Sequence, residues 1–187
     1  GLKQGDIQMT ATGLVTAGLF FFLSQAKPME AISPARPPPS VFSPSVIVSV
    51  LGQFVVHMAS LLYTLHICEE YIQPDDLTMS ADGKFYPNII NSAMFLLSAT
   101  MQVNNFVVNY RGHPFTQSIT ENKYLWRSVQ AIYAALVIVA GGQLEPINDL
   151  LQLSAFPNPT FQATLLGTLG LNFAASFVVE KVARRLE

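Results

Sequence analysis

The chain has 187 residues, of which 50% are hydrophobic and only 12% are charged, and its mean hydropathy is +0.36. A soluble domain carries about 25% charged residues, so this composition indicates a membrane protein and argues against a soluble domain. The formal net charge is −2 and the Lys and Arg residues are scattered along the chain, so we expect no nucleic-acid partner.

Five apolar runs follow one another along the chain, at residues 7–23, 46–67, 89–110, 125–142 and 161–179. Each has about 17–22 residues, close to the roughly 20 that an α-helix needs to cross a bilayer. The sequence therefore predicts an all-α fold, a polytopic membrane helix bundle of about five transmembrane helices, with residues 1–187 in a single transmembrane domain. In the last run, the small residues on one helical face, Ala163, Gly167, Gly170 and Ala174, predict a close contact with another helix. The lipid bilayer is the first expected partner.

Two of the loops have recognisable patterns. The loop at residues 25–45 contains six of the twelve prolines, and the adjacent Pro37, Pro38 and Pro39 favour a stiff polyproline segment. Because it carries Lys27 and Arg36, this proline-rich loop is predicted to be cytosolic. The loop at residues 143–159 has apolar residues at helical spacing and is predicted to form a short helix at the membrane surface.

The flanks of the five runs differ in charge between the two sides of the membrane. One side has eight basic residues, whereas the other has Lys3 and Lys84. The eight are Lys27, Arg36, Arg111, Lys123, Arg127, Lys181, Arg184 and Arg185. The positive-inside rule places them in the cytosol, so the N-terminus is expected on the far side and the C-terminus in the cytosol. The chain begins with Gly1 and has no basic segment before its first run, so we expect a piece of a longer protein and not a signal peptide.

Polar residues occupy one helical face in each of the second and third runs. They are Ser49, Gln53, His57, Ser60 and Thr64 in the second run, and Asn91, Ser98, Gln102, Asn105 and Asn109 in the third. The two faces either join the helices through hydrogen bonds worth roughly 0.6–2 kcal/mol each, or line a polar cavity for water or substrate. We therefore predict an intramembrane polar network that includes Gln53, His57, Gln102, Asn105 and Asn109.

Side chains with catalytic potential form no recognisable pattern. His57 lies in the middle of a run, where we expect a neutral ring hydrogen-bonded to a neighbouring helix, the alternative being a proton relay. The sequence shows no phosphate-binding glycine loop, metal-ligand cluster or catalytic triad, and the single cysteine, Cys68, excludes an internal disulfide. We predict no catalytic residue, metal ligand or cofactor within this chain.

Two sequence patterns are similar to those of a known family. The pattern KP…S..RP.P..F falls on Lys27, Pro28, Ser33, Arg36, Pro37, Pro39 and Phe42, and NY.G.PF…..ENK falls on Asn109, Tyr110, Gly112, Pro114, Phe115, Glu121, Asn122 and Lys123. With the stretch QFVVHMASLLY at 53–63, they resemble type V P-type ATPases. The resemblance is greatest to the A subgroup, the endoplasmic-reticulum transporters that act on transmembrane helices. It covers almost the whole chain and is strongest over residues 5–63 and 91–127.

The resemblance implies that the five runs are the sixth to tenth of ten core membrane helices. The catalytic domains would belong to the rest of the protein, and so would ATP, magnesium and the phosphorylated aspartate of the family's DKTGT motif. Hydrolysis is therefore expected of the full-length protein and not of this chain alone. The resemblance also implies a location in the endoplasmic-reticulum membrane. The further partners that it implies are the remaining helices and cytosolic domains of the full-length protein, and hydrophobic transmembrane segments as substrate.

The first run bears on the nature of the substrate. Cations need hard oxygen ligands, and ion-pumping P-type ATPases place carboxylates mid-membrane in their sixth helix, whereas residues 7–23 contain none. This favours a mis-inserted transmembrane segment as substrate, with Gln8, Thr12 and Thr16 either contacting it or packing against missing helices. The alternatives are a polyamine- or cation-transporting ATPase of the sister subgroup, another class of membrane transporter, and a stand-alone, non-enzymatic five-span scaffold protein.

Overall fold

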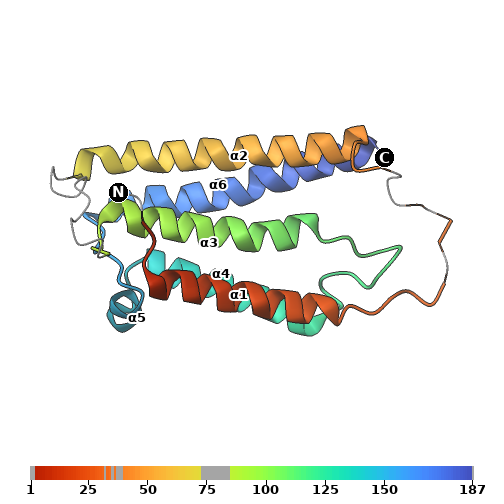
Figure 1. Ribbon diagram of the computed structural model, residues 1–187, viewed down its shortest axis with the longest axis horizontal. Helices are drawn as coiled ribbons and strands as arrows, with labels where there is room; N and C mark the ends of the chain where they lie inside the picture. The colour runs from red at the N-terminus through yellow and green to blue at the C-terminus, as the bar shows by residue number, and fades with distance from the viewer. Residues whose placement is uncertain (1–2, 32, 35, 37–39, 73–84, 187) are drawn as a thin grey trace.

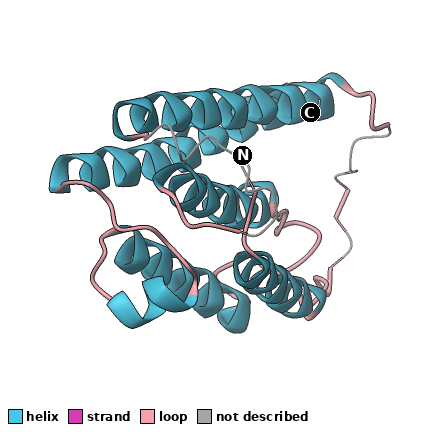
Figure 2. Ribbon diagram, turned by 60° about the vertical axis from the view of Figure 1, so that its left-hand side comes forward, coloured by secondary structure: helices cyan, strands magenta, loops and turns pink. Residues whose placement is uncertain are grey.

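The computed structural model describes residues 3–31, 33–34, 36, 40–72 and 85–186. Within these ranges the chain forms α1 (Asp6–Ser24), α2 (Pro44–Cys68), α3 (Ile89–Asn109), α4 (Lys123–Ala140), α5 (Glu145–Leu150) and α6 (Pro159–Ala183). Single turns of 3-10 helix at Glu69–Tyr71 and Arg184–Leu186 extend α2 and α6. Figure 2 shows these helices joined by loops in the described part of the chain. The expected all-α helix bundle is confirmed, and α5 is the short helix predicted within residues 143–159.

The five long helices lie roughly along one axis and run alternately in opposite directions (Figure 1). α2 and α6 pack against each other along most of their length, α3 packs on both, and α1 and α4 contact α3 and each other. We call the end where α1, α3 and α6 finish the basic end, because Lys27, Arg111, Lys123 and Arg184 lie there. The short α5 lies at the opposite end of the bundle.

Three of the five expected spans are long and apolar enough to cross a membrane, namely Asp6–Ser24, Pro44–Tyr71 and Pro159–Leu186. The other two, α3 and α4, have 21 and 18 residues but a lower hydropathy. α4 begins with Lys123 and includes Arg127, while α3 carries several amides. α3 can carry them because most of its surface faces other helices, with twelve of its residues buried. That α3 and α4 also cross the bilayer stays a prediction.

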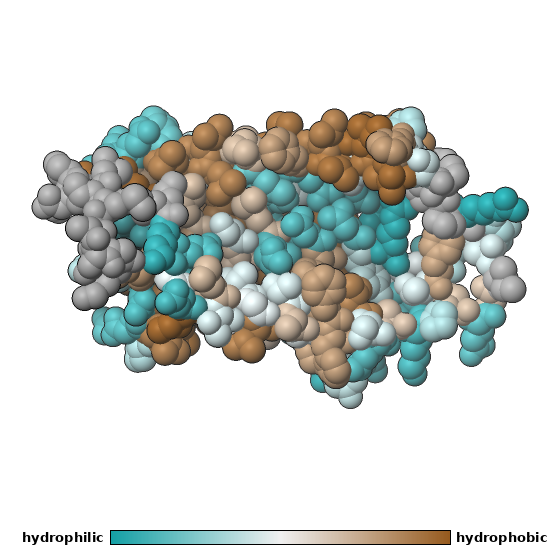
Figure 3. Space-filling model, viewed as in Figure 1, coloured by the Kyte–Doolittle hydropathy of each residue, from teal (hydrophilic) through white to brown (hydrophobic). Residues whose placement is uncertain are grey.

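The outer surface of α2 is strongly apolar. Its side chains Leu51, Phe54, Val55 and Leu62 are each more than half exposed. Figure 3 shows hydrophobic side chains over α2 along the top of the molecule, with hydrophilic ones gathered below, toward the basic end. Apolar exposure on this scale is stable in hydrocarbon and unfavourable in water, so the surface is that of an integral membrane protein.

Glycine brings two helices together, although not where the sequence predicts. A Cβ atom on Gly52 of α2 would lie 2.6 Å from a methyl carbon of Val179 on α6, so any larger residue would force Val179 to shift. Gly167 and Gly170 of α6, by contrast, have no described neighbour within 4 Å of their Cβ positions. Within the described part of the chain these two residues make no close helix contact, and α2 supplies the small residue instead.

The loops at the basic end are joined to each other. The backbone N–H of Gln117 donates to the Lys27 carbonyl over 3.0 Å, and that of Met29 donates to the Phe115 carbonyl over 3.1 Å. The side chain of Asn122 caps the start of α4 by accepting a hydrogen bond from the backbone N–H of Leu125. Its Nδ2 donates to the Phe22 carbonyl at 2.9 Å. Residues 25–31 and 110–122 thus form one structured end of the bundle. Pro37, Pro38 and Pro39 lie outside the described residues.

Candidate functional site

The amide of Asn172 on α6 is the centre of a hydrogen-bond network inside the bundle. The residue is 1% exposed. Its Nδ2 donates to Nδ1 of His57 at 3.1 Å and to Oγ of Ser60 at 2.8 Å, both on α2. Its Oδ1 accepts from Nδ2 of Asn104 on α3 at 2.9 Å. One buried amide therefore joins three helices.

The network extends from Asn104 to α4 and from His57 to the surface of α3. The Tyr133 hydroxyl on α4 donates to Asn104 Oδ1 at 2.6 Å. Because the Nδ1 atom of His57 accepts from Asn172, the ring proton is assigned to Nε2, which lies 3.4 Å from Oδ1 of Asn105. The donors therefore all point the same way, from Tyr133 to Asn105, across four helices. The hydrogen bonds of such a chain polarise one another, and a buried member left without its partner costs folding free energy.

A second polar cluster lies at the basic end around Glu180 of α6. Its side chain is 5% exposed and accepts a hydrogen bond from Nε of Arg184 at 2.8 Å, with Nη2 of Arg111 at 3.9 Å. On its other oxygen it accepts from the Ser49 hydroxyl and, at 3.4 Å, from Nε2 of Gln53. This buried charge is paired and hydrogen-bonded, which offsets the cost of removing it from water.

Gln53 connects the Glu180 cluster to α3. Its side-chain amide and that of Asn109 exchange two hydrogen bonds, of 2.9 and 3.1 Å. Arg184 adds a further link, because its Nη2 donates to the carbonyls of Val108 and Tyr110 at the end of α3. The ends of α2, α3 and α6 are therefore held by a continuous set of polar contacts.

The two polar faces of the second and third runs meet in part. Gln53 lies opposite Asn109, and His57 lies opposite Asn105. Gln102 instead turns to α1, where its Nε2 donates to the Thr16 hydroxyl at 3.2 Å. A cleft of about 670 Å³ between α1 and α3 is also lined by Gln102, Asn105 and Asn109. The arrangement thus has features of both the helix-joining and the cavity-lining hypotheses.

The three candidate substrate contacts on α1 have different surroundings. Gln8 is fully buried, with its Nε2 donating to the Leu151 carbonyl at 3.0 Å and its Oε1 accepting from the Gly5 N–H. Thr12 and Thr16 are half-buried, and their hydroxyls donate to carbonyls one turn earlier on the same helix. Gln8 therefore fixes the start of α1 to the segment after α5, while Thr12 and Thr16 lie nearer to the cavities of the bundle.

Sequence patterns missed several of the residues that organise these clusters. They are Asn104, Tyr133, Asn172, Glu180 and Arg184. A lone amide within an apolar run, such as Asn172, is a signal for an interhelical contact. The spacing of Glu180 and Arg184, four residues apart at the end of a run, is a signal for an ion pair on one helical face.

The described residues offer no group of three or more His, Cys, Asp or Glu side chains that could hold a metal ion. Glu180, the buried carboxylate, is surrounded by hydrogen-bond donors and cations, so its oxygens are not free to ligate one. The clusters are therefore suited to joining helices within a membrane, and the chemistry of cation binding does not fit them.

Comparison with known proteins is consistent with this organisation. No protein-family model matches the chain. A probable manganese-transporting ATPase of Arabidopsis thaliana is 40% identical over 84% of this chain and 13% of its own length. The endoplasmic reticulum transmembrane helix translocase of Schizosaccharomyces pombe is 34% identical over 99% of this chain and 15% of its own length. The chain is homologous to type V P-type ATPases.

These ATPases are much longer than the region compared. The translocase of Aspergillus fumigatus is 33% identical over 100% of this chain, which spans only 14% of the fungal protein. The human polyamine-transporting ATPase, of the sister subgroup, is 28% identical over 95% of the chain. The chain thus matches a membrane part of a type V ATPase, and the translocases resemble it more than the polyamine transporter does.

Proposed function

We propose that the full-length protein is an ATP-driven translocase of the endoplasmic reticulum that extracts or moves mis-inserted transmembrane segments. In this proposal the chain is its C-terminal membrane part and supports the transport site. The fungal relatives support it, because three proteins named as translocases of transmembrane helices are 32–34% identical over 96% or more of the chain.

The observation that carries the proposal is the chemistry of the buried polar groups. Among the described residues, Glu180 is the one charged side chain that is buried, and donors occupy its oxygens. The other buried polar groups are amides and hydroxyls. Transport of a dehydrated cation needs several hard oxygen ligands, and a polyamine needs free carboxylates, so this region is better suited to an uncharged substrate.

The rigid part of the bundle has a natural role in this proposal. Hydrogen bonds through Asn172 and Glu180 hold α2, α3 and α6 together, so these helices would move as one unit. α1 is attached to α3 through Gln102 and to the segment after α5 through Gln8, and its side chain Leu14 is exposed. We propose that α1 contacts the substrate segment or the bilayer, with Thr12 and Thr16 beside it, while the later helices hold α1 in position.

The remaining elements of the proposal concern the rest of the protein. ATP and magnesium would bind to domains outside this chain, where the hydrolysis would occur. The basic end of the bundle would face the cytosol and its N-terminus the lumen, since basic residues flank spans on the cytosolic side.

ATP hydrolysis by the purified full-length protein in proteoliposomes tests the proposal. We expect a hydrophobic single-span peptide to raise the rate, and spermine or Mn²⁺ in the presence of Mg²⁺ to leave it at its basal value. A variant without the phosphorylated aspartate is the control for contaminating ATPases. Stimulation by Mn²⁺ or spermine but not by the peptide would favour the cation or polyamine transporter.

A further inference from the structure

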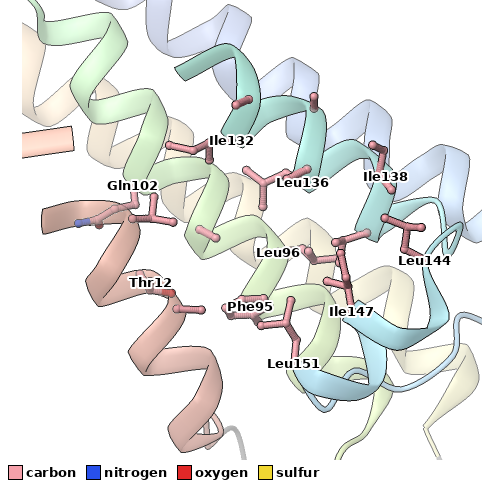
Figure 4. A pocket seen from close by; sticks show the side chains of 17 residues that line it. Thr12, Phe95, Leu96, Gln102, Ile132, Leu136, Ile138, Leu144, Ile147 and Leu151 are labelled. Atoms are coloured by element: carbon pink, nitrogen blue, oxygen red, sulfur yellow. The ribbon is translucent and has the colours of Figure 1, made fainter. Parts of the chain in front are cut away.

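A second cavity, of about 510 Å³, lies between α1, α3, α4 and α5 (Figure 4). Its walls are almost entirely apolar, and its space results from short side chains on three facing helices. The five small residues are Ala11, Ala99, Ala131, Ala134 and Ala135. Figure 4 shows Leu136 of α4 and Phe95 of α3 along its walls, with Ile147 and Leu151 at the end near α5.

The two polar side chains that line this cavity are already hydrogen-bonded. The Thr12 hydroxyl donates to the Gln8 carbonyl at 3.0 Å, and the Gln102 amide donates to the Thr16 hydroxyl. The cavity therefore presents few polar groups, and apolar walls of this kind favour a hydrocarbon over water as the occupant.

The volume of the cavity limits what the hydrocarbon can be. A helix about 10 Å across that rises 1.5 Å per residue would fit into it for only about four residues. A transmembrane segment is therefore too large. A single extended acyl chain is narrow enough, and it could enter past the α4 wall of the cavity, since Ala131, Ala134 and Ala135 are exposed.

We propose that this cavity binds one acyl chain of a bilayer phospholipid and so holds α1 against α3 and α4. The head group would lie near α5, where Glu145 and Asp149 are exposed and favour a lipid that carries an ammonium group, such as phosphatidylcholine. The site adjoins the proposed substrate contact at Thr12, which lines the cavity, but it does not depend on what the full-length protein transports.

Photolabelling of the full-length protein tests the proposal. The protein is reconstituted in phosphatidylcholine vesicles that contain phosphatidylcholine with a diazirine on one acyl chain, and labelled residues are mapped by mass spectrometry. We expect label on cavity-lining residues of α3 and α4. Ala99→Phe, which fills the cavity, should lower the amount of this label by about four- to fifteen-fold. That is the loss expected when one or two methylene groups of the acyl chain no longer fit. Ala17→Phe, on the exposed face of α1 and outside the cavity, should leave it unchanged.

The outcomes separate this proposal from a general lipid contact. Equal labelling of both variants, or label confined to residues outside the cavity, would overturn it. Ala135→Leu provides a milder filling variant if Ala99→Phe does not fold, and it must lower the same label. Replacing the probe by a diazirine phosphatidylglycerol should weaken the labelling, and equal labelling would overturn the assigned head group. Because none of these measurements involves ATP, they can fail while the translocase proposal holds, and the reverse is also true.

Discussion

The side-chain amide of Asn172 on α6 donates a hydrogen bond to Nδ1 of His57 on α2 over 3.1 Å. This contact fixes the ring of His57 as an acceptor at Nδ1, so its other nitrogen donates toward Asn105. Both partners lie within helices long and apolar enough to span a membrane. The pair thus connects two apolar helices through a polar contact inside the bundle, where a lost partner is costly to replace.

Replacing Asn172 by leucine removes three hydrogen bonds and leaves Nδ2 of Asn104 without its acceptor. We expect the free energy of unfolding to fall by about 2–6 kcal/mol, given three bonds at roughly 0.6–2 kcal/mol for each interhelical hydrogen bond. Thermal unfolding of the full-length protein in detergent measures the change. Thr164→Val is the matched control, because that exposed hydroxyl of α6 bonds within its own helix. An equal Tm for the two variants would show that the amide does not join the helices.

Glu180→Ala removes the acceptor at the centre of the basic-end cluster. The change leaves the Ser49 and Gln53 donors without their acceptor and leaves Arg184, which is partly exposed, without its carboxylate partner, so we expect a loss of about 1–3 kcal/mol. A double-mutant cycle with Arg184→Met, followed by denaturant unfolding of the full-length protein, isolates the energy of the pair. Glu145→Ala, at an exposed position, is the control. A coupling energy near zero would contradict the role of this ion pair.

Cysteines at Gln53 and Asn109 should be joined across α2 and α3 by a short bifunctional thiol crosslinker. The two native side chains exchange hydrogen bonds of 2.9 and 3.1 Å, so their positions face each other. Cysteines at Gln53 and Gln102 should not crosslink, since Gln102 faces α1. A protease site introduced between α2 and α3 makes the crosslink visible on a gel. Preferential crosslinking of the cysteines at Gln53 and Gln102 would contradict this arrangement and require a different register between α2 and α3.

The sequence predicted the helix bundle and its polar faces better than it predicted the partners within it. Hydropathy and spacing identify runs of the right length and place Gln53 and His57 on one face, because both depend on local periodicity. Partners depend on which helices pack together, which periodicity does not specify. Asn172 and Tyr133, which lie outside the two predicted faces, were therefore missed, and Gln102 pairs with α1.

The ends of the runs were a further source of error. The prediction closed the last run at Val179, and the next residue, Glu180, proved to be the centre of a buried cluster. A charge at the end of a run normally reaches water, so hydropathy alone places it outside the bundle. Glu180 is buried because Arg184, one turn later, turns back toward it and toward α3.

Gly112→Ala should disturb the loop that joins α3 and α4 at the basic end. A Cβ at this position would lie 2.8 Å from the Cα of Ser118, which is backbone and cannot move aside on its own. We expect a loss of about 1–3 kcal/mol from this overpacking and faster proteolysis within residues 110–122. Gly13→Ala, with no described atom within 4 Å of its Cβ, should instead be neutral or slightly stabilising. Equal proteolysis rates in the two variants would contradict the tight loop.

The most direct test of the account follows a fluorescent, hydrophobic single-span peptide in proteoliposomes that contain the full-length protein. We predict that ATP and Mg²⁺ cause the peptide to leave the membrane, and that the variant without the phosphorylated aspartate retains it. Retention of the peptide in the wild-type vesicles, together with ATP-dependent uptake of Mn²⁺ or spermine, would contradict the account.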